Sequence, residues 1–382
     1  MPQVPLTVLD LCRPDIKSLP IYNAGISESA ARAKYSLSRV TKLASNENPF
    51  GASPAALDAL RHSAGQICRY PDPECTALRE EIHRRTGVPA ARILFGNGSE
   101  NIIELLCQAL LAPGDRVVTL APSFGLHEIF PLMMGATVDK VPVNGVLQHD
   151  LAAWRDALSR PAKLVMFSTP SNPAGCVLST AQLQEIVDAA PRDAVLVVDE
   201  AYHEYAGTCQ ADGLQVLGAQ HRPWMVLRTL SKAYGLAALR IGYGMASGAD
   251  FVSILHKVRT PFNVNHAAQV AALAALKDTD HLQAVVSATV RERDRLLERL
   301  KSLDAERGYG LRLAPSQANF LFMDTSRPSR DVAEAMMRRG VIVKPWLEPG
   351  FDTFIRVTVG PSADNEHFIG AFTEAMTKLR AV

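Results

Sequence analysis

The stretch WMVLRTLSKAYGLAALR (residues 224–240) joins an apolar run to a polar loop that carries a single lysine. Residues 224–227 are all apolar, which is typical of a strand buried on both faces inside a parallel sheet. Lys232 comes shortly after this run. A lysine at the end of a strand is usually a solvated surface residue, so a functional role for Lys232 depends on the residues around it.

Six other runs of the same kind occur between residues 92 and 247. Segments of helical length separate them, for example residues 100–111 and 180–190. Apolar strands that alternate with helices indicate a mostly parallel sheet covered on both sides. The sequence therefore predicts an α/β fold with a mostly parallel seven-stranded sheet sandwiched by helices. The six runs are RILFGN (92–97), DRVVTLAP (115–122), ATVDKVPV (136–143), KLVMFSTP (163–170), AVLVVDEA (194–201) and IGYGMAS (241–247).

The pattern changes in the last third of the chain. Residues 263–276 and 281–303 are predicted to form helices, and the second of these has a strongly charged outer face. Shorter strand and helix patterns follow it. We expect an N-terminal arm (1–45), a large domain (46–260), and a long connecting helix with a small α+β domain (261–382). The arm lacks strong periodicity, so we expect it to pack on the large domain or on a partner subunit.

Composition argues against several classes of protein. The 382 residues carry a net charge of +1, so no long-range field favours nucleic acid or an anionic membrane. No stretch approaches the roughly 20 consecutive apolar residues that a membrane helix needs, and the N-terminus does not resemble a secretory signal. The six cysteines are scattered and the histidines lack ligand spacing, so we expect no metal site. A reducing cytoplasm is the expected compartment.

Polar residues follow several of the predicted strands. In GNGSEN (96–101), Gly98, Ser99 and Glu100 would offer free backbone N–H groups at a helix N-terminus, which suits a phosphate. An ordinary helix cap explains the same residues. Asp199 ends a buried strand, and ligands of open α/β sheets bind at that edge. A surface turn is the alternative for this aspartate.

Lys232 lies near the hydroxyls of Thr229 and Ser231, and Arg240 follows it by eight residues. A desolvated lysine near another cation has a lowered pKa and becomes a nucleophile toward carbonyl groups. Hydroxyls together with an arginine describe a pocket for a phosphate dianion. An aldehyde that carries a phosphate would satisfy the whole set. A surface position would explain Lys232 alone, but not several strand ends that converge on one edge.

The order of these stretches resembles that of the fold-type I aminotransferases, which depend on pyridoxal phosphate (PLP). STPSNPAG (168–175), VVDEAYHEY (197–205) and RTLSKAYGLAALRIGYG (228–244) carry this resemblance. KLASNENPFG, RYPDP, GNGSENIIELL and FIRVTVG are similar to the histidinol-phosphate aminotransferase group. The match runs from about residue 15 to the C-terminus. It implies the fold-type I architecture, in which the large domain binds PLP.

The resemblance implies a role for each matching residue. Lys232 would anchor PLP covalently and later carry a proton, and Asp199 would pair with the ring nitrogen. Asn172 and Tyr202 would bond the ring's 3-oxygen, and Phe124 would stack on its face. The implied cofactor-binding residues are Tyr70, Gly98, Ser99, Glu100 (through its backbone N–H), Phe124, Asn172, Asp199, Tyr202, Thr229, Ser231, Lys232 and Arg240.

The residues that match substrate-binding positions are Tyr22, Asn48, Lys344 and Arg356. Arg356 would clamp a substrate carboxylate. Many members of the group have an arginine where this chain has Lys344, and a lysine keeps the charge but loses the planar fork. Tyr70 would reach the phosphate bound by a neighbouring subunit, which implies a homodimer with shared sites.

The implied activity is transfer of an amino group between histidinol phosphate and 2-oxoglutarate, which gives imidazole acetol phosphate and glutamate in histidine biosynthesis. Three alternatives remain. A related aminotransferase would act on aromatic or other amino acids, and a threonine-phosphate decarboxylase would release CO₂ instead of transferring nitrogen. A PLP-binding sensor of a transcription regulator would need a DNA-binding domain, for which the residues before LASNENP are too few.

Overall fold

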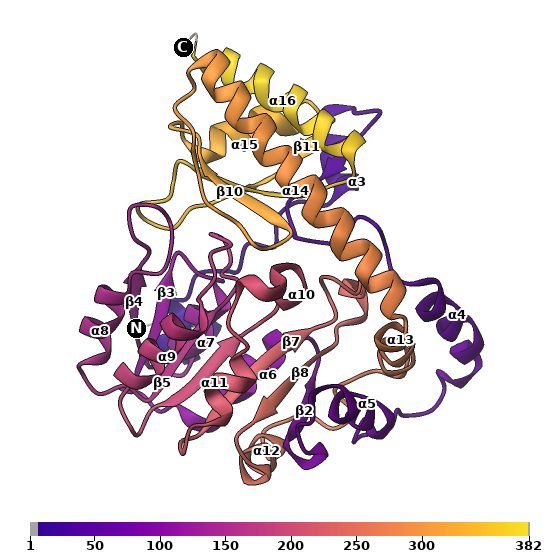
Figure 1. The fold of residues 1–382 in the computed structure, drawn as a ribbon, viewed down its shortest axis with the longest axis vertical. Helices are drawn as coiled ribbons and strands as arrows, with labels where there is room; N and C mark the ends of the chain where they lie inside the picture. Colours follow the sequence, from indigo (N-terminus) through magenta and orange to yellow (C-terminus); the bar gives the residue numbers. More distant parts are fainter. Residues whose placement is uncertain (1–6, 381–382) are drawn as a thin grey trace, which may run out of the picture.

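The computed structural model describes residues 7–380. Figure 1 shows a large lower body and a smaller upper body, with one long helix, α14 (Thr279–Arg307), running from the first to the second. This helix corresponds to the long connecting helix expected from the sequence.

A seven-stranded sheet forms the centre of the large body, in the order β2-β8-β7-β6-β5-β3-β4. Strand β8 is antiparallel to both of its neighbours, and the other neighbouring pairs are parallel. The prediction of a mostly parallel seven-stranded sheet is therefore confirmed. The strands are β2 (Ile93–Gly96), β3 (Arg116–Ala121), β4 (Thr137–Pro142), β5 (Leu164–Ser168), β6 (Val195–Asp199), β7 (Trp224–Thr229) and β8 (Gly242–Ala246).

Helices cover both faces of this sheet, so alternate residues of each central strand pack into two different apolar cores. In β6, Leu196 and Val198 pack in one core, and Val195 and Val197 pack in the other. The helices of the large body are α4 (Pro54–Ser63), α5 (Thr76–Thr86), α6 (Ser99–Leu110), α7 (Leu126–Met133), α8 (Leu151–Leu158), α9 (Thr180–Ala189), α10 (His203–Ala206), α11 (Gly213–Gly218), α12 (Ala249–His256) and α13 (His266–Lys277).

The small body combines two small sheets with three helices around a separate apolar core. One sheet is antiparallel, in the order β12-β13-β10-β9, and the other pairs β1 with β11 in parallel. Besides α14, the elements are β1 (Thr41–Lys42), β9 (Arg312–Leu313), β10 (Phe320–Asp324), β11 (Val341–Ile342), β12 (Lys344–Pro345), β13 (Phe354–Thr358), α15 (Ser329–Met337) and α16 (Ser362–Arg380).

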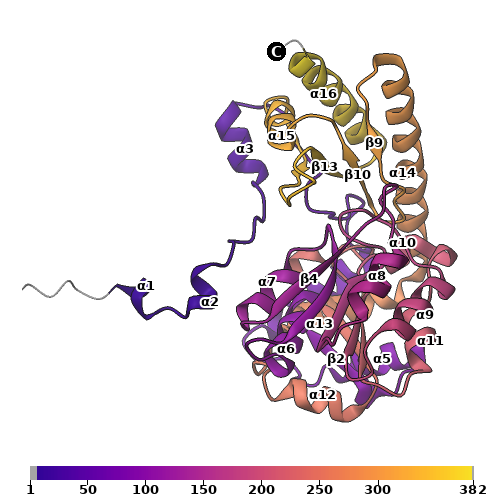
Figure 2. The same ribbon diagram turned by 90° about the vertical axis from the view of Figure 1, so that its left-hand side faces the viewer.

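The N-terminal arm has three short helices, α1 (Val8–Leu11), α2 (Pro14–Lys17) and α3 (Glu28–Tyr35). Figure 2 shows α1 extending away from the large body, whereas α3 lies beside α15. Arg13, at the start of α2, donates to the carbonyl of Met133 of α7 at 2.8 Å. Tyr35 of α3 donates a hydrogen bond to Glu334 of α15. We retain the three expected segments as a proposal, with two additions: β1 pairs within the small body, and α13 packs in the core of the large body.

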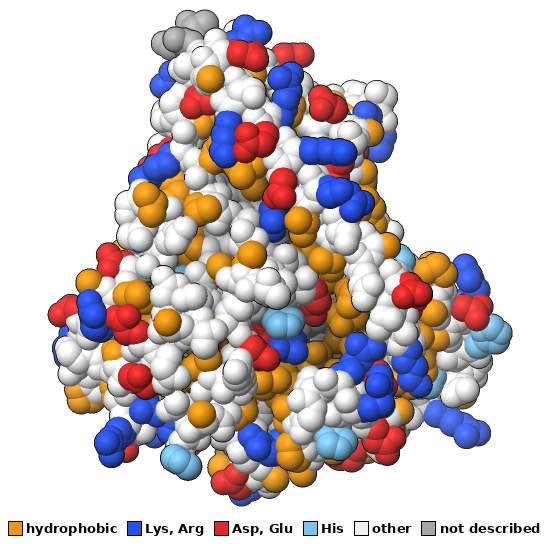
Figure 3. All heavy atoms as spheres, in the orientation of Figure 1, with side chains coloured by type: hydrophobic (Ala, Val, Ile, Leu, Met, Phe, Trp, Pro, Cys, Tyr) orange, Lys and Arg blue, Asp and Glu red, His pale blue; other side chains and the backbone are white. Residues whose placement is uncertain are grey.

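The surface carries both signs of charge. On the face in Figure 3, acidic and basic side chains are interspersed over both bodies. Across residues 7–380, none of the helices is long and apolar enough to span a membrane. No group of three or more histidine, cysteine, aspartate or glutamate side chains in this range is arranged to hold a metal ion.

We predict that Leu300→Ala in α14 destabilises the protein by about 2–5 kcal/mol, because the substitution leaves a cavity in the core of the small body. Lys301→Ala, at the next position on the same helix, removes an exposed side chain and should change the free energy of unfolding by less than about 0.5 kcal/mol. Urea denaturation of both variants checks this. Equal unfolding midpoints would show that α14 is not anchored by this core.

Candidate functional site

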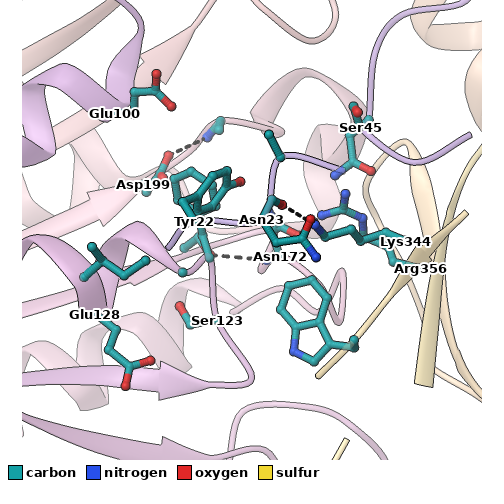
Figure 4. A pocket seen from close by; sticks show the side chains of 18 of the residues that line it. Tyr22, Asn23, Ser45, Glu100, Ser123, Glu128, Asn172, Asp199, Lys344 and Arg356 are labelled. Carbon is teal, nitrogen blue, oxygen red and sulfur yellow. Dashed lines mark hydrogen bonds between the residues drawn. The ribbon is translucent and has the colours of Figure 1, made fainter. Parts of the chain in front are cut away.

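A cavity of about 600 Å³ lies between the two bodies, at the carboxyl ends of the parallel strands. The arm contributes Tyr22 to its wall, the large body contributes residues such as Asp199 and Thr229, and the small body contributes Lys344 and Arg356. In Figure 4, Lys344 and Arg356 lie on one side of the cavity, and Asp199 lies on the other. All three parts of the chain are therefore needed to form it.

Most of the residues predicted from the sequence line this cavity, although they come from opposite ends of the chain. Two of them, Asn48 and Tyr70, do not. The predicted residues that line it are Tyr22, Gly98, Ser99, Glu100, Phe124, Asn172, Asp199, Tyr202, Thr229, Ser231, Lys232, Arg240, Lys344 and Arg356.

The side chain of Asn48 does not line the cavity, because it bonds the loop of Lys232 and its own loop. Its Nδ2 donates to the carbonyl of Ala233 at 2.9 Å, and its Oδ1 accepts from the N–H of Phe50 at 2.9 Å. Asn46 lines the cavity instead, with a left-handed φ of 54°, and donates to the hydroxyl of Tyr202 at 2.9 Å. The motif contains both asparagines, and its letters alone do not say which one faces inward.

Tyr70 is 82% exposed and takes no part in the cavity of its own chain. Its ring stacks on Phe262, with centroids 4.5 Å apart and planes 17° from parallel. Two aromatic rings are thus held together at the surface of the large body. The role of Tyr70 in a partner's site stays a prediction.

One end of the cavity is formed by the N-terminus of α6 and Arg240. A Cβ atom at Gly98 would lie 2.5 Å from Nη2 of Arg240, and one at Gly242 would lie 2.4 Å from the backbone nitrogen of Ser99. Both glycines therefore let a guanidinium and backbone N–H groups crowd around one spot, which is the arrangement that binds phosphate at helix N-termini. Glu100 was expected to contribute only its N–H, but its carboxylate also pairs with Nη2 of Arg240 at 2.7 Å.

Two hydroxyls lie at the same end. Oγ1 of Thr229 is 3.1 Å from Oγ of Ser231, and it accepts the N–H of Ser231 at 3.2 Å. Thr229 is the register partner of Gly242, so β7 brings these hydroxyls beside the turn that contains Gly98. The hydroxyls, the helix N-terminus and the arginine are together suited to bind an anion, and we call this group the anion site.

Asp199 is held by two donors at the end of β6. Its Oδ1 accepts the N–H of Ala201 at 3.0 Å, and its Oδ2 is 3.3 Å from Nε2 of His127, whose Nδ1 is 3.2 Å from Oγ of Ser123. The histidine is fully buried. Sequence reasoning gave His127 no role; its spacing of four residues from Ser123 was the available signal. The carboxylate can therefore accept a further hydrogen bond from a ligand without changing its orientation.

Within residues 7–380, the amino groups of Lys232 and Lys344 bond only backbone carbonyl groups. Nζ of Lys232 donates to the carbonyl of Ser45 at 3.2 Å, and Nζ of Lys344 donates to that of Asn23. Burial, reinforced by the positive charge of Arg356, lowers the pKa of each lysine to about 8. Both amino groups are therefore close to the point at which they lose their proton near neutral pH.

Arg356 is buried and its guanidinium is only partly satisfied. Nη1 donates to Oδ1 of Asn172 and Nη2 donates to the carbonyl of Ala44, both at 2.6 Å. Nε is buried and has no hydrogen-bond partner within residues 7–380. Burial lowers the pKa of Arg356. A buried donor without a partner is costly, so this atom indicates a place for a ligand acceptor.

Lys232, Lys344 and Arg356 thus contact neutral oxygens, and no carboxylate of the described residues forms an ion pair with any of them. Unpaired positive charge is unfavourable at a buried site. The cavity is therefore suited to a ligand that places negative charge beside these three side chains, away from the anion site at the N-terminus of α6.

The rim of the cavity contains a charged bridge that sequence reasoning did not single out. Nζ of Lys140, on β4, lies 2.6 Å from Glu128 of α7 and 3.2 Å from Glu348 of the small body. Nε1 of Trp346 donates to Glu348 at 3.2 Å. The bridge ties the loop after β12 to the large body beside the cavity.

We predict that the amino group of Lys232 titrates near pH 8 in the cofactor-free protein, below its ordinary value of 10.5. Below that pH it is mainly protonated, and above it mainly neutral. Arg356→Met should raise this midpoint, because it removes a nearby positive charge. Arg295→Met, which removes an exposed arginine of α14, is the control and should leave it unchanged. Competitive acetylation at several pH values checks this, and a midpoint near 10.5 in the unmodified protein would contradict it.

Comparison with known proteins agrees with this geometry. Residues 38–372 match the family described as aminotransferase class I and II. The chain is 45% identical over 364 residues to histidinol-phosphate aminotransferase 3 of Rhizobium meliloti (strain 1021), which covers 95% of this chain and 96% of that protein. It is 42% identical over 368 residues to histidinol-phosphate aminotransferase 1 of Mesorhizobium japonicum, which covers 96% and 99%.

Among solved structures, the histidinol-phosphate aminotransferase from Sinorhizobium meliloti in complex with pyridoxal-5'-phosphate matches with a TM-score of 0.85 and 28% identity. The match covers 96% of this chain and 97% of that one. It confirms the fold-type I architecture that the sequence motifs implied. The chain therefore belongs to the aminotransferase class I and II family.

Proposed function

We propose that the protein is a PLP-dependent aminotransferase that moves an amino group between histidinol phosphate and 2-oxoglutarate, as a step of histidine biosynthesis. The observation that carries this proposal is the pair of cationic regions in one cavity, at Arg240 and at Lys344 with Arg356. PLP and histidinol phosphate each bring a phosphate dianion, so two such regions are needed. The relatives named above carry the same activity in their names.

The residues present fit PLP. The anion site at Gly98 and Arg240 suits its phosphate, and the carboxylate of Asp199 suits a protonated ring nitrogen. Lys232, with its lowered pKa, suits covalent attachment to an aldehyde. Phe124 lines the cavity and offers a ring face. When bound, PLP supplies a ring that withdraws electrons from the carbon bearing the amino group.

The side chains around this position have distinct tasks. Lys232 holds and returns a proton, which its pKa of about 8 permits near neutral pH. His127 holds Asp199 in one orientation, in which its carboxylate would pair with the ring nitrogen of PLP. Asn46 holds the hydroxyl of Tyr202 in the cavity, where it can bond a ring oxygen.

Lys344 and Arg356 would bind the substrate's phosphate, and Arg356 would bind the carboxylate of glutamate in the other half of the reaction. The two are register partners on adjacent antiparallel strands, so their side chains leave the same face of the small sheet. In Figure 4 both point into the cavity from the same side. Arg356 has a free Nε for this purpose.

The proposal is tested by incubating the purified protein with PLP, 2-oxoglutarate and one amino donor at a time. Histidinol phosphate should be the best donor, with formation of glutamate. Better turnover of phenylalanine or tyrosine would instead assign an aromatic aminotransferase. Release of CO₂ from threonine phosphate, without glutamate, would assign a decarboxylase.

We predict that Lys344→Met raises the KM for histidinol phosphate about tenfold or more, since a charge-assisted hydrogen bond contributes about 1.5–3 kcal/mol. The KM for glutamate should change much less. Lys344→Arg, the matched control, keeps the charge and should retain most of the affinity. Steady-state kinetics with both substrates check this, and an unchanged KM for histidinol phosphate in Lys344→Met would remove Lys344 from the substrate site.

The same lysine predicts a pH dependence. Because the pKa of Lys344 is lowered to about 8, its positive charge is present below that pH and is lost above it. The KM for histidinol phosphate should therefore rise above pH 8 in the unmodified enzyme. The rise should be weaker in Lys344→Arg, because an arginine stays charged.

We also propose a cytoplasmic homodimer in which Tyr70 completes the phosphate site of the partner. The exposed, stacked position of this ring supports the proposal. Tyr70→Phe should weaken PLP binding, because it removes a hydroxyl that bonds the phosphate. Tyr35→Phe, which alters a contact of the arm with α15, is the control and should not.

A mixed dimer of Lys232→Ala and Tyr70→Phe subunits shows whether Tyr70 acts on the partner's site or on the site of its own chain. If Tyr70 acts across the interface, one site in the hybrid has both Lys232 and Tyr70, and it binds PLP with the affinity of the unmodified enzyme. If Tyr70 acts within its own chain, every site that keeps Lys232 lacks the hydroxyl and binds weakly.

A further inference from the structure

The structure assigns a positioning role to the buried ion pair between Glu200 and Arg228, which lies outside the cavity. The inference rests on the proposed PLP site. Glu200 directly follows Asp199 at the end of β6, and Arg228 directly precedes Thr229 at the end of β7. Each partner is therefore one residue away from a side chain that lines the cavity.

The pair is buried, and several hydrogen bonds fix its geometry. Nε of Arg228 donates to Oε2 of Glu200 at 2.9 Å, and Nη2 lies 2.8 Å from the same oxygen. The other oxygen, Oε1, accepts the N–H of Gly213 at 2.9 Å. The side chain of Glu200 has no exposed area, and that of Arg228 is 11% exposed. Charge-assisted hydrogen bonds at a buried site hold their partners in a fixed geometry.

The pair links two strands at the point where they diverge. The parallel ladder of β6 and β7 ends with Asp199 opposite Leu227, followed by one bond from the N–H of Glu200 to the carbonyl of Leu227 at 2.8 Å. Beyond this bond, the segment after β6 turns toward Tyr202, and the segment after β7 enters the loop of Lys232. The ion pair between Glu200 and Arg228 adds one side-chain contact between the two segments at the point where they separate.

The link lies on the face of the sheet away from the cavity, because successive residues of a strand point to opposite faces. Its polar neighbours are His203, 3.6 Å from Glu200, Asp212, 4.0 Å from Arg228, Tyr243, whose hydroxyl bonds Arg228, and the buried carboxyl group of Glu204. None of these four residues lines the cavity. The pair can therefore influence a bound cofactor only through the backbone that it holds, which places Asp199 and the loop of Lys232 relative to each other.

A bound ring needs contacts at both strand ends at once: the carboxylate of Asp199, and the amino group of Lys232. Sites of this kind need their groups held within about 0.5 Å of the productive geometry. Loss of the ion pair should loosen the spacing between the two ends while the cavity residues themselves remain unchanged.

The test is a PLP titration of the full chain after removal of its cofactor, read from the visible absorbance of the lysine-bound form. Glu200→Gln should raise the Kd for PLP about tenfold or more, the scale seen when groups that support a ligand site are removed. It should also shift the pH midpoint of that absorbance. Glu81→Gln is the control, because it removes a buried carboxylate that pairs with Arg84 and Arg85 on α5, away from the cavity.

Glu200→Gln leaves Arg228 buried without its partner, which can prevent folding. In that case the double variant Glu200→Gln/Arg228→Met is read instead, because replacing both charges removes the penalty. It should fold and still bind PLP about tenfold more weakly. A folded variant of either kind with the Kd and the pH midpoint of the unmodified protein overturns the positioning role. Failure of the unmodified protein itself to bind PLP would instead overturn the proposed function.

Discussion

Positive charge without a carboxylate partner is the constraint on which the rest of the site depends. Lys232, Lys344 and Arg356 converge on one cavity and donate only to neutral oxygens. Burial lowers the pKa of all three groups, and the positive charge of Arg356 further lowers the pKa of the two lysines. The protein therefore keeps a region of unbalanced positive charge, which the anionic ligands of the proposed function would relieve.

The fold supplies this convergence from distant parts of the chain. The parallel strands bring Asp199 and Thr229 to one edge, and the small body folds Lys344 and Arg356 over them. Tyr22 of the arm closes the side of the cavity, against Phe124. Two other cations of the cavity do have carboxylate partners: Arg240 pairs with Glu100, and Lys140 pairs with Glu128 and Glu348.

Much of this was predictable from the sequence. Strands that are apolar on both faces, such as β5 and β6, predicted the sheet, and the helix expected at residues 180–190 is α9, Thr180–Ala189. The residues that follow the strands predicted which side chains line the cavity. These features are local in the chain, and a pattern of residue types can therefore reveal them.

The parts that could not be predicted depend on contacts between distant segments. The spacing of His127 from Ser123 could not predict its bond to Asp199, since 72 residues separate His127 from this aspartate. The choice between Asn46 and Asn48 depends on one left-handed φ angle. The contact of Lys140 with Glu348 forms only once the small body is in place. Roles in a partner's site, such as that of Tyr70, stay predictions for the same reason.

The most direct test of the account is a crystal structure of the enzyme with PLP and histidinol phosphate. We predict electron density that joins the cofactor to the Lys232 side chain before substrate is added. We also predict one phosphate between Ser99 and Arg240, and a second between Lys344 and Arg356. A substrate phosphate found elsewhere, with Lys344 and Arg356 still bonded only to neutral oxygens, would contradict this prediction.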